Sequence, residues 1–330
     1  MKLLFTEENF SELFKELLGF VNKDLAFNNY KADLFTASNE LVNIIGNNIY
    51  KLAIDNEDET DEDKDTYHLV WKIRYAISIN AYRLFAPNGD LSHTGDGRKM
   101  RNEEHESNAF EWMIEKDNKA LEKRYYRALD DLITFLDNSK VETETTQTIY
   151  TVWISSDEYK SSQQLFIRTV SQFNQSFVIN SRYLLMTLQP GMKECEDLQI
   201  LSRIGKDKFN QLKEKFKNNT EISEENDILL LHHIRNAVAN YALAWAIPRL
   251  SINVFPEGIV QGYTSDRQTM KASKNPLYKE AEWAKQSFQD GCKLSLNEIE
   301  NIMAKINNQI DTTDTNVKPA IDFGDKFFSA

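Results

Sequence analysis

The sequence contains few of the residues that break helices or cross-link chains. Its 330 residues include 11 glycines, 6 prolines and 2 cysteines. Glycine and proline reach only about half or less of their usual shares of roughly 7% and 5%, which favours long helices over β-sandwiches and glycine-rich nucleotide-binding folds. Cys195 and Cys292 lie far apart in the chain, and their spacing predicts neither a metal-ligand pair nor a disulfide framework. Two cysteines in a chain of this length fit a reducing cytoplasm, or a particle assembled there.

Long hydrophobic runs are also missing. The most apolar stretch, Ala237–Ile247, is interrupted by Asn240 and is shorter than the ~20 residues that span a bilayer. The apolar residues of Met1–Phe5 are few and Glu7 follows them, which is not the pattern of a secretory signal. We therefore predict no membrane association and assign the apolar stretch to a buried helix.

Positive charge is in deficit. The chain has 51 acidic and 39 basic residues, a formal net charge of −12, which argues against a surface built wholly to grip nucleic acid. Much of the excess lies in Asp55–Asp65, where eight of eleven residues are acidic. A calcium loop is one interpretation, but the glycine of the calcium-loop spacing is absent. The other interpretation is a solvated loop that controls which partner docks where.

Motifs that carry catalytic chemistry are absent. The sequence has no P-loop, no GxGxxG after a strand, and no HExxH, CxxC or GxSxG. His105 stands among acids in a loop, which is more typical of a solvated surface than of a metal site. His232 and His233 are neighbours on a helix and point in different directions. We therefore predict no enzyme, no catalytic residues, no cofactor and no metal site.

One segment of the sequence occurs twice. Residues 69–87 align with residues 230–248 without a gap. The identities are Leu69/Leu230, Ile73/Ile234, Arg74/Arg235, Ala76/Ala237, Ala81/Ala242 and Pro87/Pro248. Further landmarks recur in the same order, namely Ile45-Gly46 with Tyr50 against Ile204-Gly205 with Phe209, and Trp112 against Trp283. This order indicates an internal repeat.

The repeat predicts a mainly α protein of two tandem similar helical units, each with a short lead-in strand and a small β-hairpin. The first unit is expected at residues 1–145 and the second at 146–310, followed by a C-terminal tail at 311–330. Val141–Thr148 is the expected joint, and its composition indicates an extended segment rather than a flexible one.

Each unit is expected to follow the same course. Lys2–Phe5 and Thr148–Ile154 are predicted as lead-in strands, the second from its alternating pattern. A hydroxyl residue then caps a helix, Thr6 in the first unit and Ser155 or Ser156 in the second. A glycine-bearing hairpin follows the repeated helix, and a long helix closes each unit.

Several residues are candidates for contacts between subunits. Arg74 and Arg235 are repeated charges in apolar helices; each either covers apolar surface at the helix edge or forms an ion pair between repeats or subunits. Trp112 and Trp283 are expected to be core anchors or, alternatively, interface aromatics. The strand-like segment and the hairpins could extend a neighbour's sheet, and the tail's phenylalanines could dock onto another subunit. The candidate interface residues are Arg74, Arg235, Tyr150, Trp153, Leu91, Leu250, Phe327 and Phe328.

The order of these landmarks resembles a family of head–tail connector proteins from phages and prophages of gut Bacteroidales, including the crAss-like phages. The matching residues of the first half are Ile44-Ile45-Gly46, Tyr50, Ile73-Arg74, Ala76, Ala81-Tyr82, Leu91-Ser92 and Trp112. Those of the second half are Phe166, Phe173, Ser181-Arg182, Ile204-Gly205, Phe209 and Ile234-Arg235. The resemblance covers most of residues 1–310, and its motifs are apolar, so they mark a fold rather than a reaction. The second half departs by an insertion before Gly205 that includes Pro190-Gly191.

The resemblance implies a structural virion protein, a ring-forming adaptor that docks below the portal protein and forms part of the DNA channel. Such rings usually hold twelve copies and contact other neck and tail ring proteins, and genomic double-stranded DNA passes through the lumen without sequence-specific binding. The implied location is the virion neck, after assembly in the host cytoplasm. Two alternatives remain open at this point: a cytoplasmic helical protein–protein interaction module without catalysis, and an enzyme with a carboxylate site.

Overall fold

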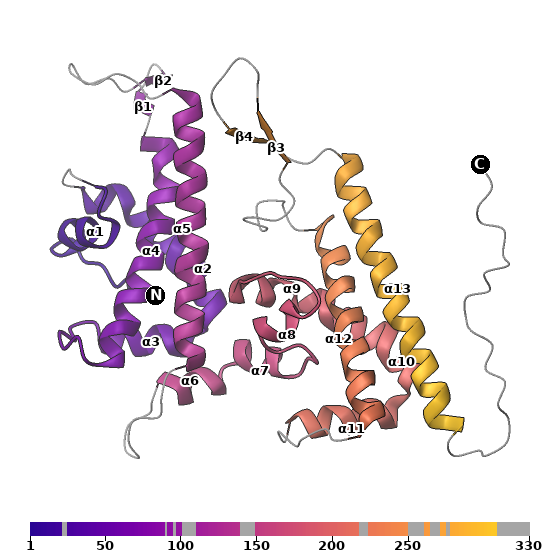
Figure 1. Cartoon of the computed structure of the whole chain (residues 1–330). Coiled ribbons are helices and arrows are strands. Elements are labelled where there is room, and N and C mark those ends of the chain that lie inside the picture. Colours follow the sequence, from indigo (N-terminus) through magenta and orange to yellow (C-terminus); the bar gives the residue numbers. More distant parts are fainter. Residues whose placement is uncertain are drawn as a thin grey trace. The chain divides into compact units, whose positions relative to one another are not determined.

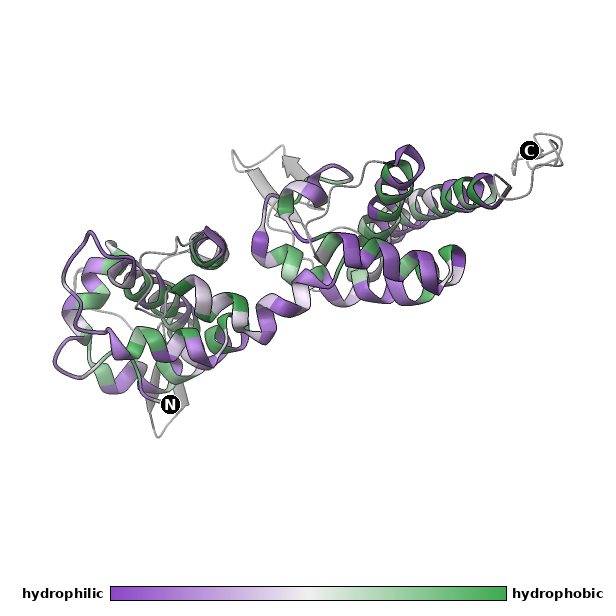
Figure 2. Cartoon of the chain, turned by 90° about the horizontal axis from the view of Figure 1, so that it is seen from below, coloured by the Kyte–Doolittle hydropathy of each residue, from purple (hydrophilic) through white to green (hydrophobic). Residues whose placement is uncertain are grey.

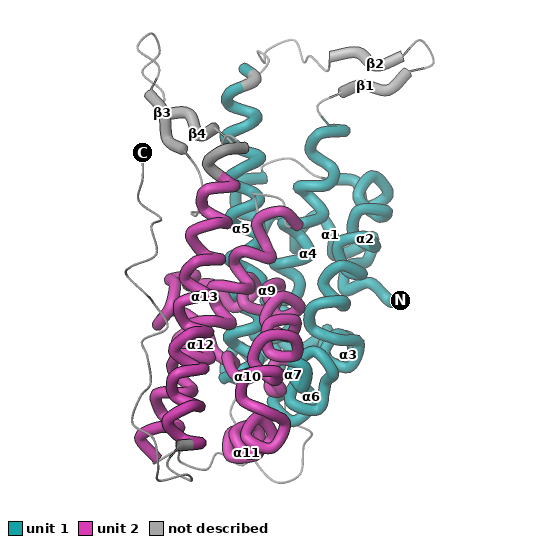
Figure 3. The backbone as a smooth tube through the Cα atoms, turned by 90° about the vertical axis from the view of Figure 1, so that its right-hand side faces the viewer, with its two compact units in different colours: residues 1–161 teal, residues 162–330 magenta. Residues whose placement is uncertain are grey.

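The computed structural model describes residues 1–21, 25–89, 91–94, 97–100, 110–138, 149–217, 224–249, 261–264, 271–274 and 278–308. The chain forms two compact units, which we call unit 1 (Met1–Ser161) and unit 2 (Ser162–Ala330) (Figure 3). Helices dominate both units (Figure 1). No helix among the described residues is long and apolar enough to cross a membrane.

Unit 1 is built around one central helix, α4. The helix contacts α1, α2, α3 and α5, and its buried residues lie on several sides, as expected of a helix enclosed by others. The elements of unit 1 are α1 (Phe10–Leu18), α2 (Phe27–Ile45), α3 (Asn47–Asp55), α4 (Asp65–Gly89), β1 (Leu91–Thr94), β2 (Gly97–Met100), α5 (Glu111–Asn138), α6 (Ile149–Ser155) and α7 (Asp157–Gln163), which runs across the division between the units.

Unit 2 has an equivalent central helix, α12, which packs against α9 and α13. The helix α9 continues through one π-helical turn, η1, into α10. The elements of unit 2 are α8 (Val170–Asn174), α9 (Arg182–Cys195), η1 (Glu196–Ile200), α10 (Leu201–Ile204), α11 (Lys206–Lys217), α12 (Glu225–Ala246), β3 (Gln261–Thr264), β4 (Lys271–Lys274) and α13 (Tyr278–Asn308).

A glycine turn occurs at the same place in both units. Gly46 joins α2 to α3 with φ 81° and ψ 156°, and Gly205 joins α10 to α11 with φ 76° and ψ 158°. This backbone conformation is essentially restricted to glycine. Both units therefore run through helix, glycine turn, helix, central helix and long closing helix in the same order.

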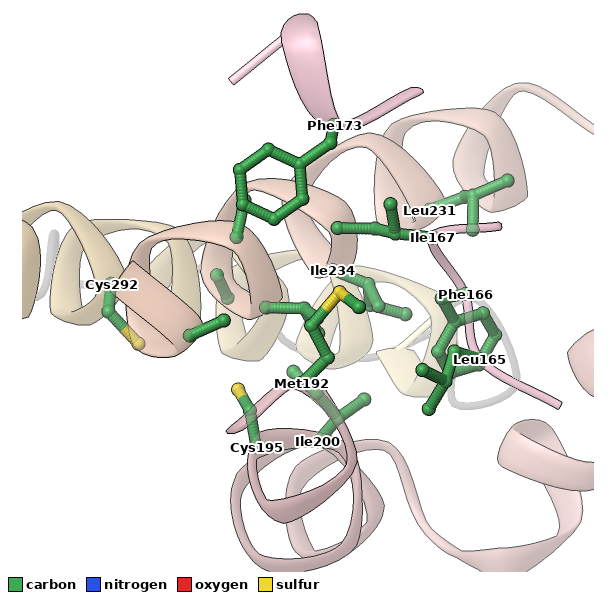
Figure 4. Packing of buried hydrophobic residues seen from close by; sticks show 14 of the residues in the cluster. Leu165, Phe166, Ile167, Phe173, Met192, Cys195, Ile200, Leu231, Ile234 and Cys292 are labelled. Carbon is green, nitrogen blue, oxygen red and sulfur yellow. The ribbon is translucent and has the colours of Figure 1, made fainter. Parts of the chain in front are cut away.

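Each unit has its own hydrophobic core. In unit 1, aromatic rings pack against one another near the N-terminus, with ring centroids 5.8 Å apart for Phe5 and Phe14 and 4.4 Å apart for Phe10 and Phe14. In unit 2 the core is mostly aliphatic and includes both cysteines (Figure 4). Figure 2 shows hydrophobic and hydrophilic residues alternating around the helices, the pattern of amphipathic helices that bury one face.

The predicted fold class is right in being mainly α, but its strand component is wrong. Lys2–Phe5 has no strand structure, and Thr148–Ile154 gives way to helix α6, which begins at Ile149. The buried residues of α6 are Ile149, Val152 and Trp153, which follow the helical spacing of three and four residues rather than alternation. Among the described residues, strand structure is confined to the four-residue segments β1 to β4, which pair β1 with β2 and β3 with β4. The units are therefore helical, and strands do not lead into them.

The boundary between the units differs from the predicted joint. Val141–Thr148 and the tail at 311–330 lie outside the described residues. The compact units divide after Ser161, because α6 packs against α3 and α5 and so belongs to unit 1.

Candidate functional site

Arg74 lies inside unit 1 and fastens its N-terminal segment. Its Nε donates a hydrogen bond to the Leu4 carbonyl at 3.2 Å, and its Nη2 donates to the Glu57 carbonyl at 3.1 Å. The Tyr50 hydroxyl donates to the Lys2 carbonyl at 2.9 Å. Burial lowers the pKa of the Arg74 guanidinium, and the nearby acids Glu57, Asp58 and Glu16 oppose that shift.

Arg235 makes the equivalent contact inside unit 2. Its Nε donates to the Phe166 carbonyl at 3.2 Å, and its guanidinium carbon lies 5.1 Å from the centre of the Phe216 ring. The ammonium group of Lys213 donates to the carbonyl of Gln164, two residues before Phe166. The segments Leu3–Phe5 and Leu165–Ile167 therefore hold equivalent places, and we call them the lead-in segments of units 1 and 2.

Threonine hydroxyls extend this equivalence. The Thr6 hydroxyl accepts from the Asn9 amide at 3.3 Å, and the Thr169 hydroxyl accepts from the Gln172 amide at 3.2 Å. Each threonine lies just after its lead-in segment, and its hydroxyl accepts from the amide three residues further along the chain. The predicted helix cap at Thr6 is wrong, because α1 begins at Phe10 with Asn9 in the N-cap position, and the Thr6 hydroxyl closes the turn that precedes the helix. Ser156 also accepts from a backbone amide, that of Tyr159, but this cap opens α7.

The lead-in segment of unit 2 is further held by a buried ion pair. The Glu196 carboxylate accepts from the Phe166 amide at 2.6 Å and from the Lys213 ammonium at 2.5 Å. The Lys213 nitrogen lies 3.8 Å from the centre of the Phe166 ring. Burial raises the pKa of Glu196 and lowers that of Lys213, while the attraction between the two groups opposes both shifts.

Trp153 and Tyr150 belong to helix α6 of unit 1. Trp153 is fully buried, and its Nε1 donates to a carboxylate oxygen of Asp137 at 2.8 Å. Tyr150 is half-buried beside it. The structure therefore places Trp153 in the core of its own unit.

Of the other candidate interface residues, one lies in strand β1 and three lie outside the described residues. Leu91 is in β1, opposite Met100 in β2. Leu250, Phe327 and Phe328 lie outside the described residues.

Trp112 and Trp283, which were first expected to be core anchors, are exposed. Trp112 near the start of α5 is 41% exposed, and Trp283 near the start of α13 is 75% exposed. Phe110, Met113 and Ile114, adjoining Trp112, are exposed as well. The core-anchor prediction is therefore wrong, and each unit presents large apolar side chains near the start of its closing helix.

The acidic loop is organised by two lysines. Lys64 pairs with Glu59 at 2.8 Å, and Lys2 pairs with Glu57. Glu103–Glu106, with His105, lies outside the described residues. Within the described part of the chain, no group of three or more His, Cys, Asp or Glu side chains is placed to hold a metal ion.

A cavity of about 430 Å³ opens in unit 2 between α9, α12 and α13. Glu194 lines it and accepts from the Tyr241 hydroxyl at 2.6 Å and from the Trp245 Nε1 at 3.0 Å. The Arg249 guanidinium lies 5.0 Å from the centre of the Trp245 ring. Sequence patterns did not indicate this cavity. Gly191 lets α9 pack closely on Trp245, because an added Cβ there would approach the ring to 3.0 Å.

Comparison with known protein families gives a match. The model of a family of unknown function (DUF6712) matches residues 14–163 and 200–309. No curated protein and no solved structure matches the chain.

Proposed function

We propose, on the premise that the chain belongs to the DUF6712 family of unknown function, that it is a structural virion protein that forms a head–tail connector ring. In this proposal the ring docks below the portal protein and above further neck and tail proteins, and genomic DNA passes through its lumen. Its location is the virion neck, after assembly in the host cytoplasm. The resemblance described above supplies this class and the expected twelve copies.

The exposed tryptophans carry the proposal. Trp112 and Trp283 are 41% and 75% exposed, and a tryptophan buried at an interface contributes more binding energy than most residues. Exposed apolar side chains gathered near one helix end, such as Phe110, Trp112, Met113 and Ile114, mark interaction sites more often than chance. A closed ring requires two different complementary faces on each subunit. The exposed apolar side chains around Trp112 in unit 1 and the exposed Trp283 in unit 2 support such a heterologous contact.

The charge of the chain is compatible with a DNA channel. Proteins that bind DNA tightly neutralise its phosphates with clustered Lys and Arg. A net charge of −12 instead favours passage of DNA without adhesion. The acidic loop around Glu59 and Lys64 contributes to this charge, and the proposal assigns it no ligand.

The test is assembly of the purified full-length chain, alone and with its portal protein, followed by mass photometry and electron microscopy. We expect closed rings in at least one of the two preparations. Trp283→Ala should weaken assembly roughly 30-fold, the equivalent of about 2 kcal/mol for a hot-spot residue.

Trp71→Ala is the matched control. Trp71 is 38% exposed but stacks on Tyr75 with ring centroids 5.2 Å apart in its own helix, so assembly should be unchanged. A chain that stays monomeric and does not bind the portal would overturn the proposal. Recovery of a host protein in its place would favour the helical interaction module.

A further inference from the structure

The two cysteines, distant in sequence, meet in the core of unit 2. Cys195 is the last residue of α9 and Cys292 lies in α13. Cys195 is 0% exposed and Cys292 is 5% exposed, and both belong to one hydrophobic cluster. Figure 4 shows the two sulfur atoms pointing toward each other from their separate helices. Both thiols are free.

The two thiols are chemically unequal. The neighbouring Cys292 thiol and burial both raise the pKa of Cys195. The neighbouring Cys195 thiol and the positive charges of Arg203 and Lys293 lower the pKa of Cys292, against the effect of burial. Because the thiolate is the reactive form, these shifts favour Cys292 as the nucleophile of the pair.

Only Cys292 is reachable from the cavity in unit 2. It lines the cavity of about 430 Å³, together with Glu194, Tyr241 and Trp245, whereas Cys195 does not line it. Cavities of this size accept small molecules. A small reagent in the cavity would therefore meet the Cys292 sulfur first.

We propose that Cys292 and Cys195 form a dithiol site that low-molecular-weight disulfides oxidise through the cavity. The Cys292 thiolate attacks one sulfur of the small disulfide, which forms a mixed disulfide and releases one small thiolate. The Cys195 thiol then loses its proton, and its sulfur attacks the Cys292 sulfur, which releases the second small thiol. The protein dithiol is oxidised to a disulfide and the small disulfide is reduced to two thiols, so atoms and electrons balance.

The product would fasten the end of α9 to α13. A cross-link between residues so far apart restricts the unfolded chain strongly and stabilises the folded state when the native geometry accepts it. The site is independent of ring formation, so its failure would leave the proposed function untouched.

The test treats the full-length reduced protein with oxidised glutathione under native conditions. Free thiols are then alkylated in denaturant, and the intact mass is measured. We expect a species that has lost two hydrogen atoms and takes up no alkylating agent, with a thermal unfolding midpoint several degrees above that of the reduced protein. Reduction should restore both alkylation sites and the original midpoint.

Two matched variants separate the steps. Cys195→Ser should stop at one glutathione bound to Cys292, and Cys292→Ser should form no adduct and no disulfide under native conditions. Both variants are first checked for native helix content and a cooperative unfolding transition. Full alkylation of the oxidant-treated wild-type protein would overturn the proposal, and so would an adduct on Cys195 in the Cys292→Ser variant. The wild-type measurement decides the question even if a variant does not fold.

Discussion

The two units fasten equivalent lead-in segments with one shared contact and several different ones. In both units an arginine of the central helix donates its Nε hydrogen to a lead-in carbonyl at 3.2 Å. The carbonyl two residues earlier is bound by the Tyr50 hydroxyl in unit 1 and by the Lys213 ammonium in unit 2. Both units therefore bind the backbone carbonyls at the same two positions of their lead-in regions. The donor at the second position differs, because it is a tyrosine hydroxyl in unit 1 and a lysine ammonium in unit 2.

The largest expected difference between the units concerns the buried ion pair of unit 2. Glu196→Ala leaves the Lys213 ammonium buried without its carboxylate, and we expect a loss of about 3–5 kcal/mol in unfolding free energy. Tyr50→Phe in unit 1 removes one neutral hydrogen bond and should cost about 1 kcal/mol. Urea denaturation measures both losses.

A double substitution is the control for this comparison. Glu196→Leu combined with Lys213→Met removes both charges and should cost clearly less than Glu196→Ala alone. A double variant as unstable as the single variant would show that packing, rather than the unpaired charge, causes the loss.

The shared arginine contact should produce losses in both units. Arg74→Ala deprives two backbone carbonyls of their donor and Arg235→Ala deprives one, so we expect losses of about 3 and 2 kcal/mol. Arg249, which donates to the Trp245 carbonyl from an exposed position, is the control, and Arg249→Ala should cost under about 0.5 kcal/mol. If chemical denaturation showed the same loss of unfolding free energy for all three substitutions, Arg74 and Arg235 would have no special role in holding the lead-in segments.

The glycine turns should respond alike. Gly46→Ala and Gly205→Ala each force alanine into a conformation that costs of order 1–3 kcal/mol. An added Cβ at Gly46 would lie 2.7 Å from a carboxylate oxygen of Glu158, whereas at Gly205 it meets no atom within 4 Å. Because the end of the Glu158 side chain can move aside, we expect thermal unfolding to show losses within about 1 kcal/mol of each other. A much larger loss at Gly46 would show that Glu158 is held in place.

The smallest expected effect is the pH dependence that Asp227 contributes in unit 2. Burial alone would raise the pKa of Asp227, but ion pairs with Lys208 and Lys215, at 2.5 and 3.1 Å, outweigh it and lower the pKa below its usual value. The carboxylate therefore adds stability above its unfolded pKa, and that stability is lost as pH falls through the lower folded value. The corresponding position of unit 1, at the offset of the aligned central helices, is Thr66.

Asp227→Asn tests this directly. It should cost about 1 kcal/mol at pH 7, because both lysines are partly exposed. The difference from the wild-type protein should shrink as the pH is lowered toward 2, when urea midpoints of the two proteins are compared. A difference that stays constant over this range would mean that the Asp227 charge makes no contribution.

The sequence allowed the helical repeat to be predicted because its strongest signals are local. The aligned central helices and the glycine turns at Gly46 and Gly205 lie where the repeat places them. The strand predicted after the joint was wrong. Ile149–Ser155 is apolar enough to fit both strand and helix spacing, and the structure makes it a helix. The second lead-in segment is instead Leu165–Ile167. It is identified by the hydrogen bond from Arg235 to the Phe166 carbonyl, which the sequence pattern does not predict.

The sites could be predicted less well than the fold. Trp112 and Trp283 were matched by the repeat, but burial depends on what packs over a helix end rather than on residue type. The Cys195–Cys292 pair and the cavity beside it arise where α9 and α13 come together, and distances in the sequence carry no information about that meeting. Arg74 and Arg235 were predicted as helix-edge or interface residues, and the structure shows that each binds backbone carbonyls within its own unit.

Hydrogen–deuterium exchange of the two arginine variants tests the central claim most directly, because it reports on each lead-in segment separately. Arg74→Ala should speed exchange in Leu3–Phe10, and Arg235→Ala should speed it in Leu165–Phe173, each with little change in the other segment. Unchanged protection of the lead-in segment in either variant would contradict the account that one arginine fastens the same point in both units.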